Sequence, residues 1–162
     1  MLILEEILDI LAQDGRTSAE EIAVRLGRPE AEIRLKMAEL EKQSIIVSYG
    51  ALINWEKMGD NKVFAFIAVE AVPEHGSGFD SVADYISRFP EVHSLYLMSG
   101  SQDLQVVVEG EDFREIARFV AEKLAPAPGV RSTSTSFVLK SYKMEGIMLQ
   151  EKPGDHRLAV SP

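Results

Sequence analysis

Seven consecutive apolar residues, Val63–Val69, are the feature that most constrains how this chain can fold. The run is too short to cross a bilayer, which takes about 20 apolar residues in a helix. A strand in a sheet with helices on one face and water on the other should alternate between apolar and polar residues. We therefore expect both faces of this strand to be covered, one by helices and the other by a second subunit. Cover by the chain's own C-terminal tail is the alternative.

The region around this run repeats one order of elements. A strand, a helix and a strand are expected twice, over residues 62–72, 79–89 and 92–98, and then over 104–108, 113–124 and 130–140. Glu111 or Asp112 lies where the start of the second helix needs a hydrogen-bond acceptor. The order βαββαβ is that of the ferredoxin-like fold, in which two helices cover one face of an antiparallel sheet.

The first part of the chain has the pattern of three helices. Apolar residues recur at helical spacing from Leu4 to Leu11. A second helix is expected to end at Gly27, and a third to have Pro29 in its first turn and to bury Ile33, Met37 and Leu40. The second helix starts at a capping box, formed by Thr17 or Ser18 with Glu20 or Glu21. Three helices in this order predict a helix–turn–helix over residues 18–42.

A strand-like run, Ile45–Ala51, follows the third helix and is typical of a winged variant of this motif. Residues 54–59 have the composition of a turn and linker. The fold class is therefore α+β, and three regions are expected. They are a winged helix–turn–helix domain with its linker (1–59), a ferredoxin-like domain (60–146) and a C-terminal tail (147–162).

Charge and cysteine content exclude several classes of function. The chain has 162 residues, no Cys and a formal net charge of −9. The absence of Cys excludes disulfide frameworks, thiolate metal sites and cysteine nucleophiles. Both halves are acidic, which argues against binding of nucleic acid or anionic membranes through bulk charge. The first residues lack the basic start of a secretory signal, so a cytoplasmic protein without a membrane association is expected.

Short motifs occur in a fixed order over about 140 residues of the chain. They are Asp14-Gly15-Arg16, Glu21-Ile22-Ala23, Leu26-Gly27, Leu40-Glu41, Ile45-Ile46, Tyr49-Gly50-Ala51, Lys57-Met58-Gly59, Gly100-Ser101-Gln102-Asp103-Leu104, Gly129-Val130, Thr133-Ser134-Thr135 and Tyr142-Lys143. In order and spacing this set resembles the Lrp/AsnC family of leucine-responsive, or feast/famine, regulators. The resemblance implies a winged helix–turn–helix that binds double-stranded DNA. It also implies an ACT-like (RAM) domain that forms dimers, tetramers or octamers and senses a small molecule, often an amino acid.

The expected recognition helix departs from the family pattern. Pro29 occupies the position of a usual serine, Glu39 that of a usual arginine, and Gln43-Ser44 replaces a common Glu-Gly pair. Its basic and acidic residues balance. We predict that Arg34 reads bases and that phosphates are held by Arg28, Lys36 and Lys42. The alternative is that these cations are ordinary surface charges, paired at helical spacing with Glu30, Glu32 and Glu39.

An effector site is predicted where a glycine turn precedes a carboxylate. Gly100 permits a tight turn, and Asp103 can accept a hydrogen bond from an ammonium group. The hydroxyl-rich strand 132–136 offers donors for a carboxylate. The predicted effector-binding residues are Gly100, Ser101, Gln102, Asp103, Thr133 and Thr135. The alternative is a β-turn capped by Asp103, beside a Ser/Thr strand that faces water.

The sequence offers no residues for catalysis. His75, His93 and His156 are far apart and lack a second ligand at helical spacing, so no metal site is expected. No phosphate-binding glycine loop or nucleophile elbow is present. We therefore expect neither an enzyme nor a cofactor. Two alternatives to a DNA-binding regulator stay open: an Lrp-like ligand-binding or assembly module without DNA binding, and a protein similar to the tetrapyrrole decarboxylases that share this architecture.

Overall fold

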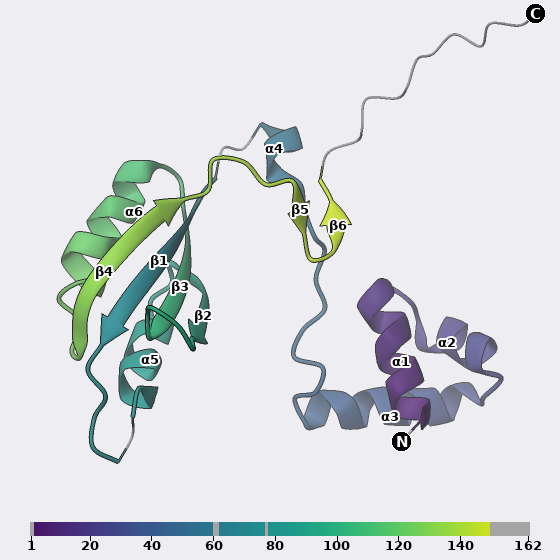
Figure 1. The fold of residues 1–162 in the computed structure, drawn as a ribbon. Helices are drawn as coiled ribbons and strands as arrows, with labels where there is room; N and C mark the ends of the chain where they lie inside the picture. Colours follow the sequence, from purple (N-terminus) through teal and green to yellow (C-terminus); the bar gives the residue numbers. More distant parts are fainter. Residues whose placement is uncertain (1, 60–61, 77, 150–162) are drawn as a thin grey trace, which may run out of the picture. The chain divides into compact units, whose positions relative to one another are not determined.

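The computed structural model describes residues 2–59, 62–76 and 78–149, and the chain divides into two compact units between Ile53 and Asn54 (Figure 1). The sequence predicts the boundary six residues later, after a linker. Residues of that expected linker instead belong to the second unit, where Trp55–Met58 form a short helix, α4. The Asn54 side-chain amide donates a hydrogen bond to the Leu149 carbonyl at 2.9 Å, and the Lys62 ammonium lies 4.8 Å from the Trp55 ring centroid.

The first unit contains the three expected helices, α1 (Leu2–Gln13), α2 (Ala19–Leu26) and α3 (Glu30–Lys42). Ser18 and Glu21 form the capping box of α2, and Gly27 ends that helix in the left-handed conformation. Pro29 is the N-cap of α3 with extended backbone, whereas the sequence places it in the first turn. One face of each helix contributes to a shared core that includes Ile7, Leu11, Ile22, Ile33 and Leu40.

The expected strand over Ile45–Ala51 is wrong. No strand is assigned between α3 and α4 in the described chain. Ser44 takes a positive φ of 55°, and the amides of Ile45 and Ile46 both donate to the Leu40 carbonyl, so these residues close the end of α3. A strand also needs a neighbouring strand for its hydrogen bonds. The segment has the composition of a strand, but Val47 is 85% exposed.

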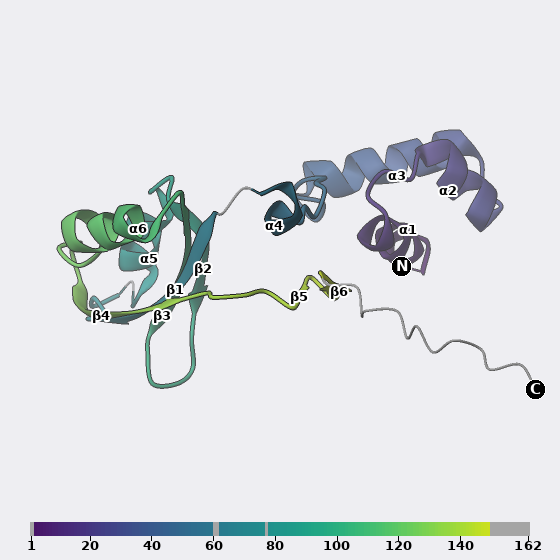
Figure 2. The ribbon, with the colours of Figure 1, turned by 90° about the horizontal axis from the view of Figure 1, so that it is seen from above.

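The second unit has the expected ferredoxin-like topology (Figure 2). Four antiparallel strands lie in the order β2-β3-β1-β4, and the helices α5 and α6 pack on one face through Val82, Ile86, Ile116 and Phe119. The bounds are β1 (Val63–Ala71), α5 (Asp80–Ser87), β2 (Val92–Leu97), β3 (Leu104–Gly110), α6 (Phe113–Phe119), a π-helical turn (Val120–Leu124) and β4 (Val130–Phe137).

One side of β1 is buried beneath the helices, and the other side is partly exposed. Ala65, Ile67 and Val69 are 0% exposed and belong to the core beneath the helices. Phe64 and Phe66 project from the opposite side because strand side chains alternate. We call this opposite side the open face; by register it also carries Ala68, Gln105, Val107, Tyr96, Ser134 and Ser136.

A small hairpin follows β4 and was not predicted. Its strands are β5 (Lys143–Met144) and β6 (Ile147–Met148), and both turn residues, Glu145 and Gly146, have positive φ. Such a two-residue turn matches the twist of the flanking strands. The domain end expected at residue 146 therefore falls inside this hairpin. Residues 150–162 of the expected C-terminal tail lie outside the described residues.

Candidate DNA-binding and effector sites

Helix α3 has one buried and one exposed side. Ile33 and Leu40 are almost fully buried in the core of the first unit, whereas Leu35 is 72% exposed. At about 100° per residue, the side opposite the core carries Ala31, Leu35, Ala38 and Lys42. This exposed side of the second helix of a helix–turn–helix is the one that can enter a major groove.

Two of the predicted DNA-binding cations are paired within α3. The Arg34 guanidinium contacts Glu30 Oε1 at 2.5 Å through Nη2 and at 2.6 Å through Nε. The Lys36 ammonium donates to Glu39 Oε2 at 3.0 Å. All four side chains are at least one-third exposed, and ion pairs this exposed contribute little free energy. Pairing within the free helix is therefore weak enough for DNA to displace it.

The other two predicted cations, Arg28 and Lys42, lie near the two ends of α3. Both residues are exposed. Within the part of the chain that the structure describes, neither side chain makes an ion pair or a hydrogen bond. The Arg28 backbone amide donates to the Ala23 carbonyl and so fixes the turn between α2 and α3. The four predicted cations thus lie on or beside one helix.

The predicted effector residues fall on two sides of β1. Gly100, Ser101 and Gln102 lie in the loop between β2 and β3, and Asp103 directly precedes β3. The Asp103 amide donates to the Val69 carbonyl at 3.1 Å, and Val69 lies opposite Thr133 of β4. The sheet topology thereby brings Asp103 and Thr133 to neighbouring positions across one strand.

Asp103 has a structural role in this loop. Its carboxylate Oδ2 accepts a hydrogen bond from the Ala71 amide at 2.8 Å, and its carbonyl accepts from the Met98 amide. This is the turn-capping interaction that the sequence raised as the alternative to ligand binding. Binding of an ammonium group would use the remaining carboxylate oxygen, since an ionised carboxylate accepts several hydrogen bonds.

The hydroxyl-rich strand β4 is divided between the two faces of the sheet. Thr133 and Thr135 are half-buried and lie opposite Val69 and Ile67, which face the helices. By the same alternation, Ser134 and Ser136 project from the open face. The predicted threonine hydroxyls therefore lie on the helix-covered side.

A series of side-chain hydrogen bonds connects this loop to Gln105 of β3, a residue that the sequence analysis missed. The Ser101 hydroxyl donates to Gln102 Oε1, and Gln102 Nε2 donates to Gln105 Oε1 at 3.1 Å. Gln105 Nε2 is buried and has no hydrogen-bond partner among the described residues. The available signal is a polar residue directly before the apolar run 106–108 of β3.

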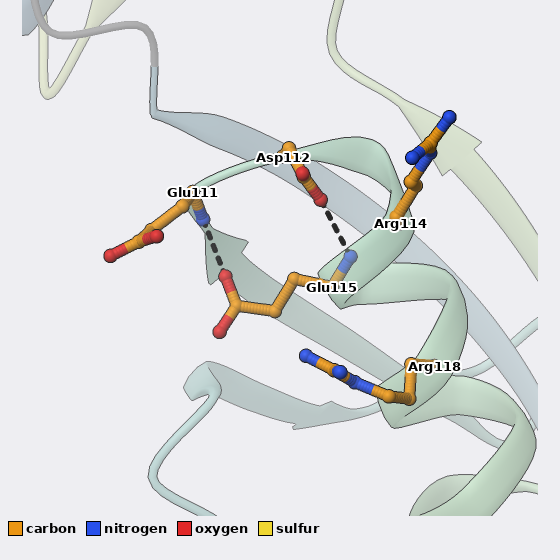
Figure 3. A pocket seen from close by; sticks show the side chains of 5 residues that line it. All are labelled: Glu111, Asp112, Arg114, Glu115 and Arg118. Carbon is orange, nitrogen blue, oxygen red and sulfur yellow. Dashed lines mark hydrogen bonds between the residues drawn. The ribbon is translucent and has the colours of Figure 1, made fainter.

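A group of charged residues lines a solvent-open hollow at the start of α6 (Figure 3). Its carboxylates serve the helix start: Asp112 Oδ1 accepts from the Glu115 amide at 2.8 Å, and Glu115 Oε2 accepts from the Glu111 amide at 2.6 Å. Such capping satisfies amides that a helix leaves unpaired. Among the described residues, no group of three or more His, Cys, Asp or Glu side chains is arranged to hold a metal ion.

Comparison with known proteins places both units in one family. The model of the Lrp/AsnC ligand-binding domain matches residues 64–148. The HTH-type transcriptional regulator YugG of Bacillus subtilis is 44% identical over 158 residues, which cover 97% of this chain and 95% of that protein. No helix within the described residues is both long and apolar enough to cross a membrane.

Solved structures agree with this assignment. A transcriptional regulator of Neisseria meningitidis, solved as a complex with L-Met, is 26% identical with a TM-score of 0.70, over 88% of this chain and 91% of that one. The leucine response regulatory protein of Mycobacterium tuberculosis, at 24% identity and a TM-score of 0.75 over 91% of this chain and 98% of that one, shares the fold. With a helix–turn–helix unit followed by a matched ligand-binding domain, the chain belongs to the Lrp/AsnC family of DNA-binding, effector-modulated transcriptional regulators.

Proposed function

We propose that this regulator binds duplex DNA through α3, with Arg34 at base edges and Arg28, Lys36 and Lys42 at phosphates. The observation that carries the proposal is the two-sided nature of α3. Ile33 and Leu40 fix one side in the core, while the opposite side is exposed and has a cation near each end. An acidic chain can bind DNA in this way because the Debye length is about 8 Å at physiological salt. Contacts at the helix then outweigh the distant net charge.

Replacing both Arg34 and Lys36 by Ala tests this assignment. Loss of a base contact costs about 1–3 kcal/mol and relaxes specificity at one position, whereas loss of a phosphate contact weakens all sequences alike and lowers the salt dependence. The measurement is the Kd of the full chain for a duplex selected from a random library, at several salt concentrations. Arg16→Ala is the matched control, because Arg16 is also an exposed cation paired with a carboxylate, Asp14, but lies outside α3. An unchanged Kd for the double variant would contradict a role of α3 in binding.

We propose that the second unit forms at least a dimer through the open face of its sheet. Phe66 is 46% exposed and Tyr96 is 55% exposed on this face. Large aromatic side chains left in water favour association, since burying apolar surface stabilises by about 25 cal/mol per Å². A dimer, a tetramer or an octamer would each present more than one helix–turn–helix to DNA.

We propose an amino acid as the effector, bound near the loop 100–103 and β4. Two observations support this: the solved Neisseria relative contains L-Met, and Gln105 keeps a buried amide without a partner beside the loop. The residues assigned to binding are Gly100, Ser101, Gln102, Asp103, Thr133 and Thr135. A ligand would change DNA binding only by its differential affinity for two arrangements of the subunits.

Asp103→Asn tests the effector site. Asn keeps an oxygen that can accept from the Ala71 amide, so the turn is preserved while the negative charge is removed. A ligand at 100 times its Kd stabilises the folded state by about 2.7 kcal/mol. Each natural amino acid is added at millimolar concentration, and the unfolding midpoint is measured. We expect a rise in the wild type, a much smaller rise in Asp103→Asn, and a full rise in the control Ser134→Ala. An equal rise in Asp103→Asn would show that the site lies elsewhere.

A further inference from the structure

The exposed side of α3 is apolar at its centre. Leu35 is 72% exposed there, and Ala31 and Ala38 lie one turn away on either side. We call these three residues the apolar ridge. Leu35 lies in the N-terminal half of α3, and the N-terminal residues of a recognition helix are the ones that contact base edges.

The charged residues of α3 lie on the flanks of the apolar ridge. At about 100° per residue, Arg34 and Glu30 lie on one flank, and Lys36 and Glu39 on the other. Each flank holds its cation in an ion pair. In this arrangement Leu35 points toward the base edges at the floor of the groove. Arg34 reaches neighbouring base edges from one flank, and Lys36 on the other flank points toward the phosphates of a groove wall.

We propose that Leu35 reads thymine through the C5-methyl group; this rests on the proposed entry of α3 into the major groove. Among the base edges of that groove, guanine, adenine and cytosine present hydrogen-bonding groups, and thymine alone adds a methyl group. A leucine side chain offers no hydrogen bond. Its contact with a polar edge would remove water without replacing the hydrogen bonds, which is unfavourable. Contact with the methyl group buries apolar surface on both molecules.

Duplex DNA fits the apolar ridge better than a protein partner does. A stable protein interface buries about 800 Å² on each partner. The apolar surface of one leucine between two alanines is too small to form such an interface. Arg28 and Lys42 near its two ends are exposed and have no side-chain partner in the described part of the chain. A narrow apolar strip with cations at both ends is complementary to a methyl-bearing groove edge between two phosphate backbones.

A thymine-to-deoxyuridine scan tests the proposal, because deoxyuridine differs from thymidine only by the missing methyl group. Each thymine of a duplex selected with the full-length wild type is replaced in turn, and the Kd is measured. At one or two positions in each half-site we expect about a fourfold loss of affinity, the effect of one buried methyl group. In Leu35→Ala the thymine and uracil duplexes should bind equally at those positions. Val24→Ala is the matched control, because Val24 is 79% exposed on α2 of the same unit.

Each other outcome has a distinct meaning. If Arg34→Ala with Lys36→Ala weakens binding but no thymine position is sensitive, α3 binds DNA and the role of Leu35 is refuted. If neither variant has an effect, the proposed DNA contact by α3 fails as well. If Leu35→Ala changes the oligomeric mass in light scattering while the thymine preference persists, the apolar ridge contacts another subunit. Circular dichroism verifies that Leu35→Ala keeps its helices, as expected for an exposed position.

Discussion

Glu30 and Glu39 form ion pairs with Arg34 and Lys36, two of the cations that are proposed to contact DNA. Each carboxylate lies within 3.0 Å of a cationic nitrogen, Glu30 on Arg34 and Glu39 on Lys36. DNA must therefore displace an intramolecular anion before it gains these contacts. Exposed pairs of this kind contribute about 0.3–0.5 kcal/mol each, so the carboxylates compete only weakly with DNA for the two cations. The contributions of the two pairs should add, because they share no residue.

Replacing Glu30 and Glu39 by Gln should strengthen DNA binding about three- to fivefold, which corresponds to releasing both pairs. The dependence of Kd on salt should become steeper, because Lys36 is freed to neutralise a phosphate. Glu32→Gln is the control: it removes the same charge from the same helix, but Arg34 and Lys36 form their ion pairs with Glu30 and Glu39 and not with Glu32. If Glu32→Gln raises the affinity as much as Glu30→Gln does, the gain reflects net charge and not the release of Arg34.

At the scale of elements, sequence patterns predict structure where the determinant is local. The capping box at Ser18 and the left-handed Gly27 fix the ends of α2 through contacts within a few residues, and both predictions are confirmed. The strand predicted over Ile45–Ala51 is wrong because strand hydrogen bonds need a partner that the described chain does not supply. The two-residue strands of the β5–β6 hairpin are too short for a periodic signal, and only the Gly146 turn marks them.

The candidate sites also differ in whether local sequence or contacts between distant residues determine them. Helical periodicity alone places Ile33 inward and Leu35 outward, so the exposed side of α3 could be predicted. The ion pairs of Arg34 and Lys36 occur at the spacing the sequence allows. In contrast, which hydroxyls of β4 face the helices depends on the pairing of Thr133 with Val69, a contact between residues far apart in sequence.

At the scale of the whole molecule, the apolar run of β1 favours burial of both faces of the sheet. One side of the strand is buried under α5 and α6, and the other side carries Phe64 and Phe66 on the open face. A chain with a net charge of −9 resists nonspecific association, so contact between copies needs a specific apolar surface. We propose that Phe64 and Phe66 supply such a surface on the open face.

Charges introduced on the two sides of β1 should have different effects. Ile67→Glu places a carboxylate in a site that is 0% exposed, and the second unit should unfold, because an unpaired buried charge is strongly destabilising. Phe66→Glu changes a residue that is 46% exposed, so the chain should stay folded while dimerisation weakens. Light scattering at several concentrations gives the mass, and circular dichroism gives the folded fraction. Val24→Glu, an exposed apolar-to-acidic change in the first unit, should leave both unchanged. A monomeric wild type, or a Phe66→Glu variant of unchanged mass, would contradict association through the open face.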